Sequence, residues 1–306
     1  MRKKVKEMRL LMLLLGSFIP LFLCAQNYIE VGYTPSRTFF DKDRNNCGSG
    51  DLWQIKGMYS HTFSTKLNEN GQPIVWAGTI NGMYAKMNNK GYAAEYNPEQ
   101  ILNLGFNLTY IRPLTKKNPK WYMMASIGAG IYAAPNDIAW RSILVNGGVV
   151  FAYRLAKGLD VGVGAGLTTS FGVPLVMPMT FVKWTSTGQY EITIEAMSNI
   201  RASVARRFGN RFRLELVPCD MDGMSSVFRQ DGKNKLYSVM RMRAYIHPEL
   251  KVGKRSSVYL NAGMDLFHSV NVTNKSIKGF ADNFTKEDRW KFNQEFNIVA
   301  GFKYGF

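Results

Sequence analysis

Cysteine and histidine are scarce in this chain of 306 residues, which contains three of each. No two cysteines form a CxxC pair and no two histidines a His-x-His pair, so no metal-ligand spacing is recognisable. Cys24 lies in the N-terminal segment, which leaves Cys47 and Cys219 for the rest of the chain. One disulfide between them and two free thiols are both open, and free thiols are the expectation. We expect no metal and no cofactor.

Long apolar runs are missing as well. After residue 25 no stretch of about 18 apolar residues occurs, so no transmembrane helix is expected. Acidic residues are few, 22 against 39 Lys and Arg, which gives a net charge of +17. Such a balance often indicates nucleic-acid binding, but the basic residues here are scattered over predicted loops. Attraction to anionic lipopolysaccharide phosphates explains them better, and we expect no nucleic-acid partner.

The N-terminus has the pattern of a secretory signal. A basic segment precedes an apolar stretch over residues 10–23, which is too short for a confident transmembrane helix. We expect residues 1–25 to be removed as a signal peptide and residues 26–306 to form one domain. Leu23 at the −3 position meets the small-residue rule for cleavage only in part. The same side chain is too large to precede a lipidated Cys24.

The C-terminal fifteen residues largely alternate between apolar and polar or small side chains. The apolar positions are Phe296, Ile298, Ala300, Phe302, Tyr304 and Phe306. A period of two predicts a strand with one apolar and one polar face. An aromatic last residue resembles the closing strand of bacterial outer-membrane barrels, in which it helps the assembly machinery to recognise its client. We therefore expect Phe306 to be an assembly signal and that machinery to be a partner.

The alternation recurs over about twelve segments, each near the ~9–11 residues that cross a bilayer at a tilt. It predicts an all-β fold, a single transmembrane antiparallel up-and-down β-barrel in the outer membrane of a Gram-negative bacterium. Short periplasmic turns and longer extracellular loops are expected, with both termini on the periplasmic side. The predicted strands cover residues 28–39, 52–63, 74–86, 101–112, 121–133, 142–155, 159–171, 190–207, 212–219, 236–247, 257–268 and 292–306. The predicted outer loops cover residues 40–51, 87–100, 134–141, 172–189, 220–235 and 269–291.

Aromatic residues on the outward parity form two predicted girdles, which suit the headgroup boundaries of a bilayer. One girdle includes Trp76, Tyr110, Trp121, Tyr153 and Tyr304, near the periplasmic strand ends. The other includes Trp53, Tyr84, Phe171 and Phe292, near the outer ends. A soluble β-sandwich would have no reason to sort its aromatics in this way.

The predicted lumen has two unlike walls. One is rich in small residues, including Ser126, Gly128, Gly130, Gly148, Gly162, Gly164 and Gly166. The other carries charges, namely Glu191, Glu195, Arg201, Arg213, Glu215, Arg241 and Arg243, with Asp265, Glu295 and Lys303 from the last two strands. A polar channel with a charged constriction is one interpretation, mildly anion-selective because arginine is in excess. The other is a plugged, non-conducting scaffold in which glycines permit bending and the charges pair.

Enzymatic activity finds little support in the sequence. A lipid hydrolase embedded in a barrel would need a Ser–His pair oriented by a third group. His61, His247 and His268 lie near the ends of different strands without such partners, so no catalytic residue is expected. The apolar segment 172–189 is the best candidate for a lid.

Two segments carry a family resemblance. Ser170-Phe-Gly-Val-Pro-Leu-Val-Met-Pro-Met179, followed by Trp184, is the first, and Pro218-Cys-Asp-Met-Asp-Gly-Met-Ser-Ser-Val227 is the second. They resemble an uncharacterised family of outer-membrane β-barrels from Bacteroidota, defined only as a domain of unknown function. The resemblance implies a fold and a location for the mature chain, and it implies no activity.

Overall fold

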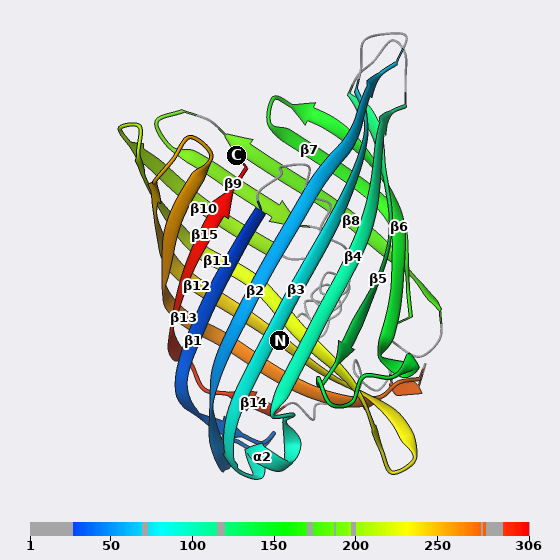
Figure 1. The fold of residues 1–306 in the computed structure, drawn as a ribbon, viewed down its shortest axis with the longest axis vertical. Coiled ribbons are helices and arrows are strands. Elements are labelled where there is room, and N and C mark those ends of the chain that lie inside the picture. The colour runs from blue at the N-terminus through cyan, green and yellow to red at the C-terminus, as the bar shows by residue number, and fades with distance from the viewer. Residues whose placement is uncertain are drawn as a thin grey trace.

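The computed structural model describes residues 27–68, 73–114, 120–169, 174–186, 188–196, 200–276, 278–279 and 290–305, and it forms one closed antiparallel sheet (Figure 1). The predicted signal peptide and Phe306 lie outside these residues. The first eight strands are Asn27–Phe40 (β1), Asn46–Leu67 (β2), Pro73–Gly91 (β3), Gln100–Pro113 (β4), Trp121–Ala133 (β5), Ile143–Ala156 (β6), Leu159–Thr168 (β7) and Leu175–Ser186 (β8). The others are Glu191–Ala196 (β9), Ile200–Phe208 (β10), Phe212–Gln230 (β11), Lys233–Lys251 (β12), Ser256–Asn274 (β13), Trp290–Phe292 (β14) and Glu295–Tyr304 (β15).

The barrel closes between the first and last strands. Sequential strands pair along the sheet, and β1 also pairs with β15, where Val31 stands opposite Ala300. On its other side β15 pairs with β13, and β14 occupies the same place between β1 and β13. β14 and β15 are therefore one interrupted strand, and the described residues form a ring of fourteen strand positions. Closure removes the exposed edges that an open sheet would present.

The expected count of about twelve strands is wrong for two reasons. The predicted loop and lid 172–189 contains β8, whose hydrogen-bonded partners are β7 and β9. The predicted strand 190–207 is two strands, β9 and β10, which pair antiparallel with each other. β8 was missed because both of its faces carry apolar residues and Pro178 interrupts it, so the period of two is absent. The two additional strands keep the count even, and both described chain ends still lie at one end of the barrel.

The prediction of long outer loops is also wrong in part. Hairpin β11–β12 runs through the predicted loop 220–235 and turns at Asp231 and Gly232, both with positive φ (53° and 72°). An Asp-Gly pair is a strong signal for such a turn. At the start of β2, only residues 41–45 separate two strands where a loop over 40–51 was expected. These strand extensions carry many polar residues, which hid their alternation.

The two ends of the barrel differ. We call the end with Asn27 and Tyr304 the terminal end, and the end with the short helix Tyr92–Tyr96 (α2) the far end. Hairpin β2–β3 projects beyond the rim at the terminal end (Figure 1). At the far end, a single 3₁₀ turn, Trp140–Ser142 (η1), lies between β5 and β6. In the described part of the chain, no helix has the length and apolar character to cross a membrane.

The outer wall of the barrel is apolar. Large side chains are exposed on nearly every strand, among them Ile29, Ile80, Phe106, Ile127, Val163, Val176, Leu216, Ile246, Ile298 and Phe302. Two aromatic pairs lie on this wall towards the terminal end: Trp76–Tyr110, with ring centroids 4.5 Å apart, and Trp121–Tyr153, 4.9 Å apart.

Phe292 is the exception to the predicted girdles, because its side chain is only 6% exposed and packs inside the barrel. The break at residues 293–294, between β14 and β15, reverses the alternation there. Phe171 lies outside the described residues.

Candidate functional site in the barrel interior

The inner wall at the terminal end carries a network of ion pairs, here called the vestibule network: Glu191, Arg201, Arg213, Glu215, Glu249 and Lys303. The Arg213 guanidinium donates to Glu191 (3.0 Å) and Glu215 (2.7 Å), and Arg201 donates to Glu215 at 2.9 Å. These residues stand at alternate positions on β9, β10 and β11, so their side chains share one face. The side chains of Arg201 and Arg213 are 25% and 22% exposed, so solvent reaches this end of the interior.

The other members of this wall are paired in the same way. Lys303 of β15 donates to Glu249 of β12 (3.2 Å), and its ammonium lies 3.0 Å from Nε2 of His247. Lys183 of β8 lies 3.6 Å from Glu195 of β9. Glu295 differs from these: it stands in register with Asp265 at the start of β15, towards the far end, and its carboxylate accepts from the Phe296 N–H at 3.0 Å.

Deeper in the barrel lies a second cluster, the central network: Arg37, Gln54, Lys56, Asp220, Asp222, Arg241, Arg243 and Asp265. Arg241 donates two hydrogen bonds to Asp222 (2.9 and 2.8 Å) and one to Gln54 (3.0 Å). Arg243 pairs with Asp220 at 2.8 Å, and Lys56 pairs with Asp222. Because Gln54 and Lys56 lie on β2 while Asp222 lies on β11, these contacts cross the lumen.

Several members of the central network are not among the residues that the sequence predicts to face the lumen. Asp220 and Asp222 were assigned to an outer loop, although they lie on β11. Arg37 pairs with Asp265 at 2.6 Å, and a register shift between Thr34 and Arg37 displaced it from the expected parity. Lys56 was detectable, since it is a charged residue at an inward position of an otherwise mixed strand. With these carboxylates included, the expected excess of arginine in the lumen is wrong.

The wall of small residues is not a void. β8 packs Met177, Met179 and Phe181 over it, with Met179 in register with Gly164 and Phe181 with Gly162. A Cβ atom on Gly148 would lie 2.8 Å from the Met179 sulfur. These β8 side chains form a buried apolar cluster with Ile111, Met124, Val150 and Ala152. The missing side chains of β6 and β7 make room for the strand that sequence analysis placed in a loop.

An apolar cluster occupies the far end, here called the far-end plug: Phe39, Leu52, Met83, Ala85, Met87, Ala93, Ile101, Met224, Tyr237, Val239, Val270 and Phe292. Tyr237 of β12 donates to the Asn97 side chain at 2.8 Å. Asn103 of β4 donates to the carbonyl of Ser225 on β11 (2.6 Å) and accepts from its N–H (3.3 Å). β4 and β11 are seven positions apart in a ring of fourteen, so opposite walls touch there.

The three histidines lie apart. His61 is exposed and stacks on Tyr59, with ring centroids 6.4 Å apart. His247 contacts the Asn261 side chain through Nδ1. His268 is buried edge-on against Phe292, with ring centroids 5.0 Å apart. Across the ranges that the structure describes, no group of three His, Cys, Asp or Glu residues could hold a metal.

Both described cysteines are free and half-buried. Cys47 lies at the far end, where its thiol donates to the Asn45 carbonyl at 3.4 Å. The predicted strand 212–219 ends at Cys219, which places this residue at the outer end of the barrel. It lies instead within β11, opposite Ala202, because that strand continues to Gln230.

Comparison with known proteins identifies a family. The family model described as Domain of unknown function (DUF6268) matches residues 21–305. The search of curated proteins found no match.

Among solved structures, an outer membrane channel from Pseudomonas putida F1 is 9% identical, over 94% of this chain and 98% of that one, with a TM-score of 0.42. The P. putida toluene transporter TodX is 8% identical, over 92% and 90%, with a TM-score of 0.35. The transport unit of the autotransporter AIDA-I from Escherichia coli is 10% identical, over 99% and 98%, with a TM-score of 0.31. The barrel described above rests on the register of this chain and not on these likenesses.

Proposed function

The chain belongs to this DUF6268 family, and we propose that it is an integral outer-membrane β-barrel whose interior is closed. In this proposal it serves as a structural or surface-binding scaffold and not as an open pore. The closed ring, the apolar outer wall and the aromatic pairs near one end support insertion in a bilayer. The basic and apolar N-terminal segment supports export. The partners in this proposal are outer-membrane lipids, lipopolysaccharide and, during biogenesis, the barrel-assembly machinery.

The contact between β4 and β11 carries the case for a closed interior. An open channel needs its opposite walls apart along the whole axis. Here Asn103 and Ser225 are joined by two hydrogen bonds across the ring, and the far-end plug fills the space beside them. A second apolar cluster of Leu144, Val227 and Leu236 joins β6 to β11 and β12.

The paired charges of the lumen support the same proposal. Selective pores present charges to passing ions, whereas Arg241 is 1% exposed and donates three hydrogen bonds to Asp222 and Gln54. Among the described residues no hydrogen bond joins a histidine to a serine, and an embedded hydrolase is not part of the proposal.

Planar-bilayer recording tests the proposal. Folded, inserted protein is expected to show no steady conductance. Truncation of the plug by Met224→Ala with Tyr237→Ala is expected to produce conducting events, since both side chains lie where the walls meet. Steady conductance from the unmodified protein would overturn the closed interior.

A narrow pore for small polar or anionic solutes is the second candidate, and the solvent-accessible vestibule network favours it. In that case the plug is a closed state, and conductance appears without mutation. Arg241→Glu with Arg243→Glu should then shift selectivity towards cations. In the closed barrel the same double change lowers stability and gives no conductance, because it places like charges together.

A further inference from the structure

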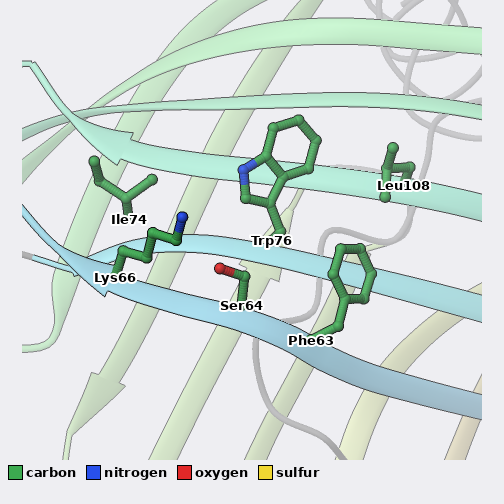
Figure 2. Close-up of a pocket in the computed structure, with 6 residues that line it drawn as sticks. All are labelled: Phe63, Ser64, Lys66, Ile74, Trp76 and Leu108. Atoms are coloured by element: carbon green, nitrogen blue, oxygen red, sulfur yellow. The ribbon is translucent and has the colours of Figure 1, made fainter.

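A shallow groove of about 540 Å³ lies on the outward face of the barrel, where hairpin β2–β3 leaves the wall at the terminal end (Figure 2). Its lining comes from three neighbouring strands: Phe63, Ser64 and Lys66 of β2, Ile74 and Trp76 of β3, and Leu108 of β4. The register sets Ser64 opposite Trp76 and Lys66 opposite Ile74, so these four residues share the outward face.

A β-bulge shapes this groove. The β2–β3 register shifts between Thr62 and Ser64, which leaves Phe63 as an extra residue. Its ring turns over Gly78, where a Cβ atom would lie 3.3 Å from Phe63 Cε1. Bulges redirect side chains in this way, and a strand glycine permits the close approach. The groove therefore opens between the displaced Phe63 ring and the Trp76 ring.

The groove is amphipathic along the barrel axis. Phe63 and Leu108 lie nearer the middle of the barrel, whereas Lys66 and Ile74 lie nearer the tip of the hairpin. Trp76 is between them and packs on Tyr110, and such pairs mark the headgroup level of a bilayer. In Figure 2 the Lys66 amine and the Ser64 hydroxyl lie in the space between the Ile74 and Trp76 side chains. Among the described residues that line the groove, none is acidic.

We propose that this groove binds one glycerophospholipid. Its phosphate lies at the Lys66 ammonium and the Ser64 hydroxyl, and an acyl chain lies along Phe63 and Leu108. An ammonium group attracts an anionic headgroup, while the lysine stem covers apolar surface. The inference rests on the proposed function, because the groove meets lipid only if the outer wall lies in a bilayer.

Native mass spectrometry of folded, detergent-purified full-length protein tests this site. Phosphatidylglycerol is the probe, and glycerol 3-phosphate is the parallel probe without acyl chains. We expect one retained phosphatidylglycerol per barrel and no retained glycerol 3-phosphate. Lys66→Gln and Trp76→Ala should each lower the bound fraction about five- to tenfold. Trp121→Ala is the matched control, since Trp121 forms the other aromatic pair near the terminal end and should leave retention unchanged.

Equal retention by the groove variants and the unmodified protein would overturn the site, and so would equal binding of glycerol 3-phosphate. A folded barrel that fractionates with membranes but retains no lipid overturns the groove alone. A protein recovered in the soluble fraction overturns the proposed function itself.

Discussion

Arg241 illustrates how single residues hold the interior together. Its guanidinium is 1% exposed, and three hydrogen bonds from Nε and Nη2 to Asp222 and Gln54 offset part of the loss of water, while Nη1 is buried without a partner. Removal of one partner from such a pair leaves the other charge buried and alone, which costs much more than the pair itself contributes. Arg241 is therefore important mainly because its removal would leave the buried Asp222 carboxylate with fewer partners.

We expect Arg241→Ala to lower the free energy of unfolding by about 3–5 kcal/mol, because it leaves Asp222 with fewer partners in a buried place. Urea titration of the folded barrel measures this. Lys183→Ala is the control, since Lys183 is 37% exposed and 3.6 Å from Glu195, and should cost about 0–1 kcal/mol. Similar losses in both variants would contradict a special role for the central network.

The inner-wall glycines give a second residue-scale prediction. A Cβ on Gly164 would lie 2.0 Å from the Val149 carbonyl oxygen, which is backbone and cannot give way cheaply. Gly164→Ala should therefore destabilise the barrel by about 1–3 kcal/mol. At Gly188 the nearest atom to an added Cβ is 3.9 Å away, so Gly188→Ala should be nearly neutral. Thermal unfolding, followed by the loss of heat-modifiable mobility on gels, compares the two.

Residue parity predicts a good share of the interior, and its failures have local causes. Strict alternation placed Glu191, Arg201, Arg213 and Glu215 on one wall, where the ion pairs now join them. Alternation fails wherever the backbone gains or loses a residue. The shift before Arg37 and the break after Phe292 are such places, and neither leaves a clear mark in the sequence.

At the scale of elements, β8 decides the shape of the interior. Its inward Met177, Met179 and Phe181 complete a core with the glycine-rich β6 and β7. The sequence of β8 is apolar on both faces and contains a proline, so it reads as a loop that packs on the rim. Only the pairing with β7 and β9 shows that it is part of the wall.

We expect Met177→Ala with Met179→Ala to destabilise the barrel by about 2–5 kcal/mol for each residue, because the glycines opposite cannot fill the cavity. Val176 directly precedes Met177 and is 67% exposed on the outer wall, and Val176→Ala should cost about 1 kcal/mol or less. Guanidinium unfolding curves of the three proteins provide the measurement. A double variant as stable as the Val176 variant would mean that β8 does not contribute to a packed core.

At the scale of the whole molecule, the sequence predicts the architecture better than the details. Period-two patterning predicted a closed all-β barrel, an even strand count and the placement of both described chain ends at the same end of the barrel. It did not predict the far-end plug, because that cluster unites residues from β1, β2, β3, β4, β11, β12, β13, β14 and α2. Contacts so distant in sequence carry no local signal.

A charge on the outer wall tests membrane insertion. Ile298 is 38% exposed on β15, and Ile298→Arg should cost on the order of 2–4 kcal/mol if it lies near the bilayer midplane. Ile298→Leu should be nearly neutral. Folding titrations into lipid vesicles measure both. A tolerated arginine at this position would mean that the wall faces water.

Phe306 lies outside the described residues, and its role as an assembly signal stays a prediction. Phe306→Ala should lower the amount of folded, heat-modifiable protein in cells while synthesis is unchanged. Normal assembly of this variant would make the terminal aromatic incidental.

The proposed closure of one end has a consequence for which solution the interior side chains contact. The interior of a barrel that is open at both ends exchanges water and solutes with two compartments, whereas the interior of a barrel that is closed at one end exchanges with one. In the proposed closed barrel, the vestibule network is exposed to solvent on the terminal side, and the far-end plug separates it from the other side. Protons, salt and small solutes therefore reach these side chains from a single compartment, and a change in the opposite compartment leaves their ionisation untouched.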